Sequence, residues 1–294
     1  MPEVETIRRH LAPQLEGRVL ETLDVQDERW SQPLAGEELS AAVQGRTLEQ
    51  LDRRGKYLIF VLEDDVHLLV HLRMTGTLLL DPPEPTRFGR VTFAFGGGRR
   101  LVFDDPRRFG TGELALGTPA REEFLARRLG VEPFSPDFTS AHLYALTRAS
   151  RAPVKAFLLD QRKVAGVGNI YADEALFRAR IHPLRPASAL KRGQVAGLRE
   201  AVIAALEEGV AAKGASIDDF RHPDGVQGSF QDRFLIHLRE GEPCVRCGTK
   251  VRKLRAAGRG TYVCERCQPR PRRRRYAAAA SARRSPARSA RASS

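Results

Sequence analysis

Long apolar runs are missing from this sequence. No stretch approaches the roughly 20 consecutive apolar residues that a membrane-spanning helix needs. The opening residues, MPEVET, carry acids and no base, which is unlike a secretory leader. Hydrophobic residues make up 41% of the chain and charged residues 29%, which is typical of a globular protein. These absences predict a cytoplasmic protein with no membrane partner, long enough for two domains.

Cysteine is scarce, and the four cysteines all lie near the C-terminus. They form CVRC (residues 244–247) and CERC (264–267), separated by the 16 residues 248–263. This spacing predicts a four-thiolate site for one structural Zn²⁺. Two disulfides are the alternative, which a reducing cytoplasm disfavours. The predicted metal ligands are Cys244, Cys247, Cys264 and Cys267.

The segment between the two cysteine pairs predicts a small hairpin. Apolar residues mark two short strands, and AAGRG (residues 256–260) forms the turn between them. Arg259 would lie near the tip, where an arginine can reach a phosphate or enter a nucleic-acid groove. A plain turn residue is an equally good interpretation of this motif alone.

Acidic residues are absent from residues 269–294, which hold nine arginines. The net charge of the chain is +13, so the remainder carries 13 − 9, or +4. Such a segment cannot bury a core, and we expect a disordered arm that contacts nucleic-acid phosphates. A tail that only aids solubility is the alternative.

The first half is rich in alternating apolar runs, and the middle is helical. Strands are expected within 56–63, 66–80, 90–95 and 100–104, with the glycine triplet at 96–98 as a hairpin turn. Helices are expected at 152–160, 169–179 and 193–209, with Asn169 as the N-cap of the second. The predicted fold class is α+β, with an N-terminal antiparallel β-sandwich, a helical region and a C-terminal four-cysteine zinc finger.

The first residues allow two interpretations. Pro2 is favourable at the first helical position, and Val4, Ile7, Leu11 and Leu15 would give that helix an apolar stripe. A Met before Pro is also normally removed, which would leave Pro2 as a secondary amine at the chain end. An α-amine with a pKa of roughly 8 is neutral far more often than a lysine side chain at pH 7, and is therefore the better nucleophile.

Together these segments resemble the bacterial formamidopyrimidine-DNA glycosylase family. The matching motifs occur in family order: PEVET (2–6), RRGKYL (53–58), HLRMTG (71–76), DPRRFG (105–110), GVGNIYADEALF (166–177), IHP (181–183), GEPCVRCG (241–248) and CERCQ (264–268). The resemblance implies a DNA glycosylase and abasic-site lyase that acts on oxidised purines in double-stranded DNA as a monomer near the nucleoid. It implies a sandwich domain over 1–130, a linker over 131–137, a helix–two-turns–helix domain with a lesion loop over 138–233, a finger over 234–268 and a tail over 269–294.

The resemblance also assigns roles to single residues. Pro2 is the implied nucleophile, Glu3 the proton shuttle, and Lys56 and Arg259 contact the lesion and its flanking phosphates. Asn169 is implied to hold phosphate, and Arg151 is a further expected DNA contact. Met74, Arg107 and Phe109 are implied to fill the gap left by a flipped nucleotide.

Two departures from the family pattern stand out. The usual start has three more residues between the first Pro-Glu and Val-Glu-Thr, and His237 replaces a phosphate-contacting tyrosine. The short start resembles endonuclease-VIII-type enzymes, so oxidised pyrimidines are an alternative substrate. The lesion loop is expected within 220–230, whose residues do not fix the substrate. A non-catalytic DNA-binding protein is the third hypothesis.

Overall fold

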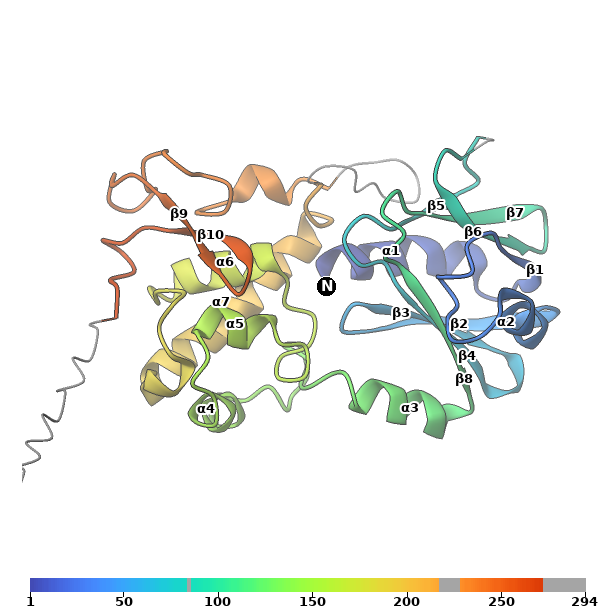
Figure 1. Cartoon of the computed structure of the whole chain (residues 1–294), viewed down its shortest axis with the longest axis horizontal. Helices are drawn as coiled ribbons and strands as arrows, with labels where there is room; N and C mark the ends of the chain where they lie inside the picture. The colour runs from blue at the N-terminus through green and yellow to red at the C-terminus, as the bar shows by residue number, and fades with distance from the viewer. Residues whose placement is uncertain (84–85, 217–227, 272–294) are drawn as a thin grey trace, which may run out of the picture.

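The computed structural model describes residues 1–83, 86–216 and 228–271. Most of the expected lesion loop (220–230) and all but the first three residues of the expected tail (269–294) lie outside these ranges. Figure 1 shows two halves, a strand-rich half and a helical half that carries a small hairpin, with the N-terminus between them. Among the described helices, none has the length and apolar character to cross a bilayer.

The strand-rich half is a sandwich of two antiparallel four-stranded layers joined at β1. Strand β1 pairs with β6 along most of its length but with β2 only at Val19 and Leu20, so the sheet turns over there. One layer contains β1 (Val19–Val25), β5 (Thr77–Leu80), β6 (Gly89–Phe95) and β7 (Arg99–Asp104). The other contains β2 (Arg46–Arg54), β3 (Tyr57–Leu62), β4 (Val66–His71) and β8 (Thr111–Leu116).

The predicted sandwich is therefore confirmed, including the hairpin turn at the glycine triplet between β6 and β7. The apolar run 66–80 is not one strand, because a turn at residues 72–76 separates β4 from β5. Three short helices complete this half: α2 (Gly36–Val43), the 3-10 helix η1 (Glu63–Asp65) and α3 (Thr118–Ala126).

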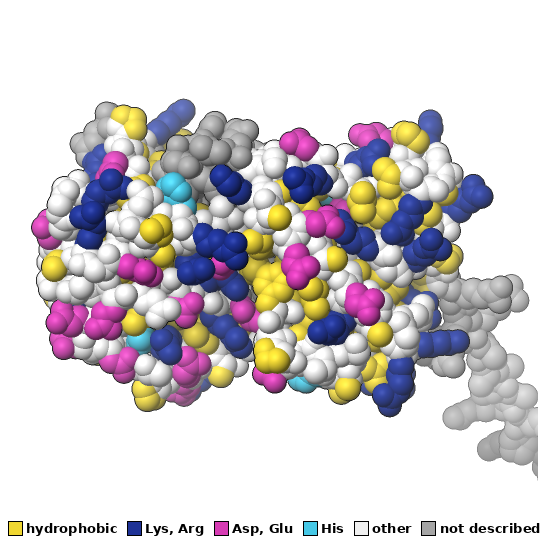
Figure 2. All heavy atoms as spheres, turned by 180° about the vertical axis from the view of Figure 1, so that it is seen from behind, with side chains coloured by type: hydrophobic (Ala, Val, Ile, Leu, Met, Phe, Trp, Pro, Cys, Tyr) yellow, Lys and Arg dark blue, Asp and Glu magenta, His cyan; other side chains and the backbone are white. Residues whose placement is uncertain are grey.

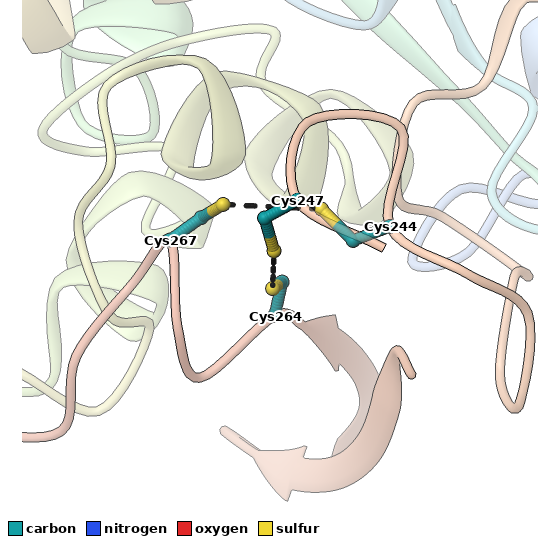
Figure 3. Close-up of side chains that lie close together, drawn as sticks. All are labelled: Cys244, Cys247, Cys264 and Cys267. Carbon is teal, nitrogen blue, oxygen red and sulfur yellow. Dashed lines mark hydrogen bonds between the residues drawn. The ribbon is translucent and has the colours of Figure 1, made fainter. Parts of the chain in front are cut away.

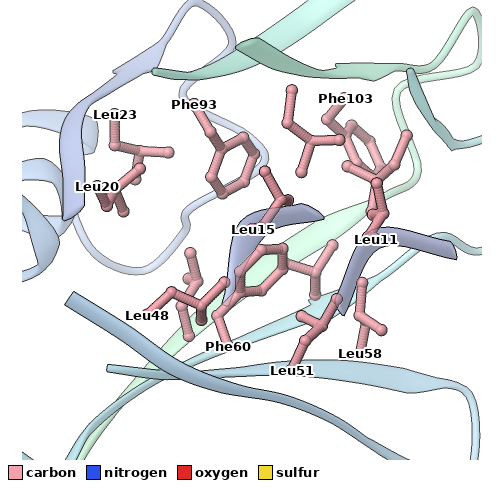
Figure 4. Packing of buried hydrophobic residues seen from close by; sticks show 14 of the residues in the cluster. Leu11, Leu15, Leu20, Leu23, Leu48, Leu51, Leu58, Phe60, Phe93 and Phe103 are labelled. Carbon is pink, nitrogen blue, oxygen red and sulfur yellow. The ribbon is translucent and has the colours of Figure 1, made fainter. Parts of the chain in front are cut away.

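Apolar side chains from both layers meet in one core, to which helix α1 (Pro2–Leu15) contributes (Figure 4). Phe60 of β3 stacks on Phe93 of β6, with ring centroids 5.4 Å apart and planes 15° apart. The predicted apolar stripe of α1 is confirmed, since Leu11 and Leu15 are fully buried in this core. The same helix therefore anchors the N-terminus to the sandwich.

The helical half has its own core around four helices: α4 (Ser140–Arg148), α5 (Val154–Leu159), α6 (Asn169–Arg178) and α7 (Arg192–Ala211). Thr139 caps α4 by accepting the backbone N–H of His142. Along the chain, the short 3-10 helix η2 (Ala187–Ala189) precedes α7, and the 3-10 helix η3 (Phe230–Arg233) follows it. Met1 packs into this second core, so the N-terminus is held by both halves.

Strands β9 (Arg252–Ala256) and β10 (Arg259–Val263) form the predicted hairpin, which packs on α6 (Figure 1). Viewed from the opposite side, the surface carries both signs of charge, with hydrophobic side chains exposed between the halves (Figure 2).

Candidate active site

The start of α1 borders a cavity of about 350 Å³ where the sandwich, the helical half and the hairpin meet. The sandwich contributes the strand end at Lys56 and the turn after β4, and the helical half contributes the start of α6. The lining residues are Met1, Glu3, Val4, Lys56, His71, Leu72, Arg73, Met74, Gly76, Gly168, Asn169, Ile170, Tyr171, Ala215, His237 and Arg259.

The α-amine of Met1 lies 3.4 Å from Oε2 of Glu3. Burial lowers the pKa of this amine to about 5, although the Glu3 carboxylate acts in the opposite direction. An amine with this pKa is neutral at pH 7 and keeps its lone pair available. The cavity therefore favours an unprotonated amine at the chain end.

The carboxylate of Glu3 is held in one orientation. Its Oε1 accepts a hydrogen bond from the Tyr171 hydroxyl at 2.6 Å and a longer one from the Ala215 N–H at 3.4 Å. The Tyr171 ring is itself stacked on Phe230, with centroids 5.2 Å apart. Burial raises the pKa of Glu3, but the neighbouring amine and the Tyr171 hydroxyl outweigh it, and the pKa lies below its usual range.

Pro2 is the first residue of α1 and is buried. It is not among the residues that line the cavity, and its nitrogen lies in the peptide bond with Met1. A Cβ built on Gly209 would come 2.9 Å from the Pro2 ring, so the close approach of α7 to α1 requires glycine there. In the full chain the α-amine at the cavity thus belongs to Met1.

Lys56 reaches from the β2–β3 turn towards the helical half. Its Nζ donates to the Val167 carbonyl at 3.0 Å, just before α6 begins. Burial lowers the pKa of Lys56 to about 8, and the nearby Arg259 guanidinium adds to this effect. The ammonium form still dominates at neutral pH, so Lys56 supplies a positive charge that helps link the two halves.

Asn169 does not cap α6 with its side chain, contrary to the sequence-based expectation. Gly168 occupies the N-cap position, and Asn169 is the first helical residue. Its Nδ2 instead donates to the Gly260 carbonyl at 3.3 Å, because the hairpin packs directly against this helix start. Arg259 is exposed at the start of β10 and lines the same cavity.

Tyr171 and His71 also line the cavity, although the sequence assigned them no chemical role, and His237 lies beside them. Tyr171 orients Glu3, and His71 accepts the Arg73 N–H on Nδ1 at 3.0 Å. Burial lowers the pKa of His71 to about 3, so its imidazole is neutral. His237 binds Oδ2 of buried Asp173 through Nδ1 at 2.8 Å. The motifs HLRMTG and GVGNIYADEALF, which contain His71 and Tyr171, were the sequence signal for these two residues.

The expected wedge residues lie on two exposed loops. Met74 is 63% exposed and lines the cavity, whereas Arg107 and Phe109 lie on loop 105–110 outside it. Phe109 is 55% exposed, which is unusual for a large apolar side chain. Arg151 is exposed ahead of α5 and does not line the cavity.

The four cysteines converge as predicted (Figure 3). Their Sγ atoms all lie within 4.8 Å of one another, and Cys244 and Cys264 are buried. Four thiolates bound to Zn²⁺ at about 2.3 Å stand about 3.8 Å apart, which this cluster fits without a disulfide. The site is structural, because all four ligands come from protein and none faces the cavity.

Three family models match the chain in order. "Formamidopyrimidine-DNA glycosylase N-terminal domain" covers residues 1–112, "Formamidopyrimidine-DNA glycosylase H2TH domain" covers 129–221, and "Zinc finger found in FPG and IleRS" covers 241–270. The formamidopyrimidine-DNA glycosylase of Chloroflexus aurantiacus is 41% identical over 274 residues, covering 91% of this chain and 96% of that protein. The chain belongs to the formamidopyrimidine-DNA glycosylase family. The glycosylase of Thermus thermophilus is 44% identical over 270 residues, covering 91% of this chain and 97% of that protein.

Solved structures of formamidopyrimidine-DNA glycosylases share this fold. The crystal structure of MutM (Fpg) from Thermus thermophilus has a TM-score of 0.83 at 43% identity, covering 91% of this chain and 98% of that one. Lactococcus lactis Fpg in complex with abasic-site DNA has a TM-score of 0.85 at 34% identity, covering 92% and 99%. A mutant of the L. lactis enzyme was solved with Fapy-dG DNA.

Proposed function

We propose that this chain excises oxidised purines, such as 8-oxoguanine and formamidopyrimidines, from double-stranded DNA and then cleaves the abasic strand. Family membership supports the glycosylase assignment, and relatives solved with abasic-site and Fapy-dG DNA support the substrate class. The observation that carries the proposal is the cavity that joins an unprotonated α-amine, Glu3, Lys56 and Arg259 from separate parts of the chain.

The proposed nucleophile is the secondary amine of Pro2, freed by removal of Met1. Its lone pair attacks C1′ of the deoxyribose, and the glycosidic bond breaks with its electron pair leaving on the base. Ring opening then gives a cationic iminium. This electron sink labilises a C2′ proton, so that the 3′-phosphate and afterwards the 5′-phosphate leave by β- and δ-elimination. In the full chain, burial lowers the pKa of the neighbouring Met1 amine, and Pro2 is itself buried; we expect burial to favour the neutral Pro2 amine in the same way once Met1 is removed.

Glu3 is the proposed proton shuttle. It follows the nucleophile directly, and the Tyr171 hydroxyl fixes the carboxylate towards the chain end. Its low pKa means that Glu3 starts as a carboxylate, which can accept the proton that the Pro2 nitrogen loses after it attacks C1′. The protonated Glu3 then gives this proton to O4′ as the sugar ring opens, and the regenerated carboxylate later accepts the C2′ proton from the iminium intermediate.

Lys56, Asn169 and Arg259 are the proposed contacts to the lesion and its flanking phosphates. Lys56 and Arg259 bring positive charge to one cavity, and the start of α6 adds backbone N–H groups that suit an anion. The zinc-bound cysteines hold the hairpin that carries Arg259, while zinc itself takes part in no step.

Met74, Arg107 and Phe109 are proposed to occupy the stack when the nucleotide flips out. Two of these side chains, Met74 and Phe109, expose large apolar surfaces that base stacking would cover.

We further propose that Arg151 contacts the DNA backbone. We also propose that the protein acts as a monomer and that it works at the nucleoid in the cytoplasm.

Oxidised pyrimidines are a second candidate substrate class. Wild-type L. lactis Fpg, a relative at 34% identity, was solved with DNA containing an oxidised pyrimidine. Comparing excision from 8-oxoguanine and thymine glycol duplexes decides between the two, and we expect faster excision of 8-oxoguanine.

Borohydride trapping tests the proposed chemistry. The processed protein, incubated with an 8-oxoguanine or abasic duplex, should give a covalent adduct that mass spectrometry places on Pro2. Pro2→Gly, or an N-terminal tag that retains Met1, should abolish the adduct. An adduct on Lys56 or on Met1 would refute the assignment to Pro2 but keep the lyase. No adduct from the processed protein would instead support a non-catalytic DNA-binding protein.

A further inference from the structure

Two turns of the sandwich each carry one large, exposed apolar side chain and one residue with an unfavourable backbone conformation. Loop A is residues 72–76, between β4 and β5, and holds Met74; loop B is residues 105–110, between β7 and β8, and holds Phe109. Each loop also has an arginine in the left-handed region, with φ of 58° at Arg73 and 59° at Arg108. Non-glycine residues are uncommon there, so contacts from outside each loop must hold this conformation.

The side chain of Asp105 supplies such contacts to both loops. Its Oδ1 accepts the Thr75 hydroxyl of loop A at 2.5 Å and the Arg107 N–H of loop B at 3.1 Å. Its Oδ2 accepts the N–H groups of Phe109 at 2.8 Å and Gly110 at 2.9 Å. One carboxylate therefore binds loop A at the residue after Met74 and loop B at Phe109 itself.

Asp105 is completely buried and fixed to the sheet. Its backbone N–H donates to the Phe88 carbonyl at 3.0 Å, and its own carbonyl accepts from Arg90 Nε at 3.0 Å. A buried charge is costly unless it is well hydrogen-bonded, and four donors on two oxygens meet that need. On the outer side of loop B, Arg108 forms a two-pronged ion pair with Asp27 at 2.5 and 2.7 Å.

We propose that Asp105 is a positioning residue that sets loops A and B as one unit, so that Met74 and Phe109 enter the DNA stack together. This rests on the proposed function, in which these side chains replace a flipped nucleotide. A shared carboxylate gives the two wedges a fixed relative position before DNA arrives, which lowers the entropic cost of inserting both.

The substitution Asp105→Asn distinguishes the proposed positioning of loops A and B from a role in the chemical steps. The amide keeps one acceptor oxygen, but its NH₂ group faces backbone N–H donors that then have no acceptor. Insertion of Met74 and Phe109 should be impaired. The chemistry should be largely kept, because the hydrogen bonds of the Asp105 carboxylate go to loops A and B and not to the α-amine, Glu3 or Lys56. A single-stranded abasic oligonucleotide needs no stack filling and reports on the chemistry alone.

The experiment compares two rates for each variant: single-turnover excision of 8-oxoguanine from a duplex, and borohydride trapping on a single-stranded abasic oligonucleotide. For Asp105→Asn the ratio of duplex to single-strand rate should fall about tenfold to a hundredfold. Thr75→Val, which removes one donor and leaves the carboxylate, should lower the ratio by about threefold. A duplex with 2-aminopurine beside the lesion should also show a smaller fluorescence rise with Asp105→Asn.

Asp104→Asn is the matched control, since the adjacent Asp104 is partly exposed and its Oδ2 accepts the Phe88 N–H at 3.0 Å, which belongs to neither loop A nor loop B. Its ratio should equal that of the wild type. An unchanged ratio in Asp105→Asn, or equal losses on both substrates, would overturn the proposal. Should Asp105→Asn fail to fold, an unchanged ratio in Thr75→Val overturns it instead. A wild-type protein inactive on both substrates would refute the proposed function.

Discussion

The β-sandwich and the zinc finger present residues to the same cavity, but different forces hold them. The sandwich buries apolar side chains from both layers and from α1, including the stacked pair Phe60 and Phe93. The apolar cluster of the finger is small. Its buried residues are Phe177, Ile236, Cys244, Val251, Tyr262 and Cys264, and the two cysteines among them are predicted metal ligands.

The finger compensates with buried polar contacts to the helical half. Lys155, completely buried, donates from Nζ to the Gly260 carbonyl at 3.1 Å and to Thr261 Oγ1 at 2.8 Å, and pairs with Asp173 at 2.7 Å. Gln268 donates to the Ile181 carbonyl at 2.9 Å. Metal coordination and charge, rather than apolar burial, thus determine the position of Arg259.

Removing zinc should have the largest effect, because it should unfold the finger and leave the sandwich folded. A structural Zn²⁺ contributes roughly 10–16 kcal/mol, which the small finger cluster cannot replace. Chelation should unfold the finger and weaken duplex binding more than about tenfold, because the proposed phosphate contact at Arg259 would be lost. Fluorescence anisotropy measures the binding. Trp30, the only tryptophan, is buried in the sandwich core and should keep its emission.

The reciprocal control is Phe60→Ala. This core truncation should cost about 3–5 kcal/mol of unfolding free energy, because a cavity replaces a stacked ring. The urea midpoint followed by Trp30 emission should fall, while zinc content stays complete. A chelator-induced change in Trp30 emission like that of Phe60→Ala would mean that the two regions unfold as one.

Breaking the buried ion pair should have the next largest effect. Lys155→Met leaves Asp173 with one partner, His237, and should destabilise the helical half and finger by about 3 kcal/mol. The hairpin also loses two hydrogen bonds to Nζ, so zinc should transfer faster to a coloured chelator. Lys163→Met is the control, since that partly exposed lysine lies over Phe157 without contacting the finger. Equal transfer rates in both variants would argue against the bridge.

The smallest expected effect is the pH-dependent difference in stability between Glu5→Gln and the wild type. Burial raises the pKa of Glu5, but hydrogen bonds from Arg8, Arg9 and Arg53 hold it at about 2, below its usual 4.5. This depressed pKa contributes stability above about pH 4.5, and the contribution is lost as the pH falls towards about 2. Glu5→Gln should therefore cost about 2 kcal/mol at pH 7 and progressively less below pH 4.5.

Denaturation monitored by Trp30 at several pH values measures that trend. Zinc release also follows acid, because the thiolates must stay deprotonated, but it should be the same in Glu5→Gln and wild type. A stability difference that grows on acidification would show that the Glu5 carboxylate is not stabilised by its arginines.

Local patterns in the sequence predicted the elements that local forces build. The stripe of α1, the glycine triplet between β6 and β7, and the two CxxC turns each depend on residues close in the chain. Asp105, Tyr171 and Lys155 could not be assigned in this way. Tyr171 meets Glu3 across 168 positions, and Lys155 meets Gly260 across 105, so only the folded chain brings them together. Asn169 was wrongly expected to cap α6, because the helix begins at Asn169 and Gly168 takes the cap position. Its Nδ2 donates to Gly260 of the hairpin, a contact that no local pattern predicts.

The family resemblance predicted some site residues that their chemical character alone would not have indicated. Met74 and Phe109 are apolar and would be placed in a core by composition alone, yet both are exposed. The packing around Pro2 could not be predicted either, because it depends on the distant Gly209 of α7, which leaves room for the rings of Pro2 and Tyr171.

Four sulfur atoms gathered at one centre also make the finger sensitive to oxidants. Oxidation of these thiolates to sulfenic acid or to disulfides removes the ligands and releases the metal, and a reductant restores them. The oxygen species that damage guanine can thus also detach the element that carries Arg259. Thiol-reducing capacity in the cell would then limit how long such a protein stays competent during oxidative stress.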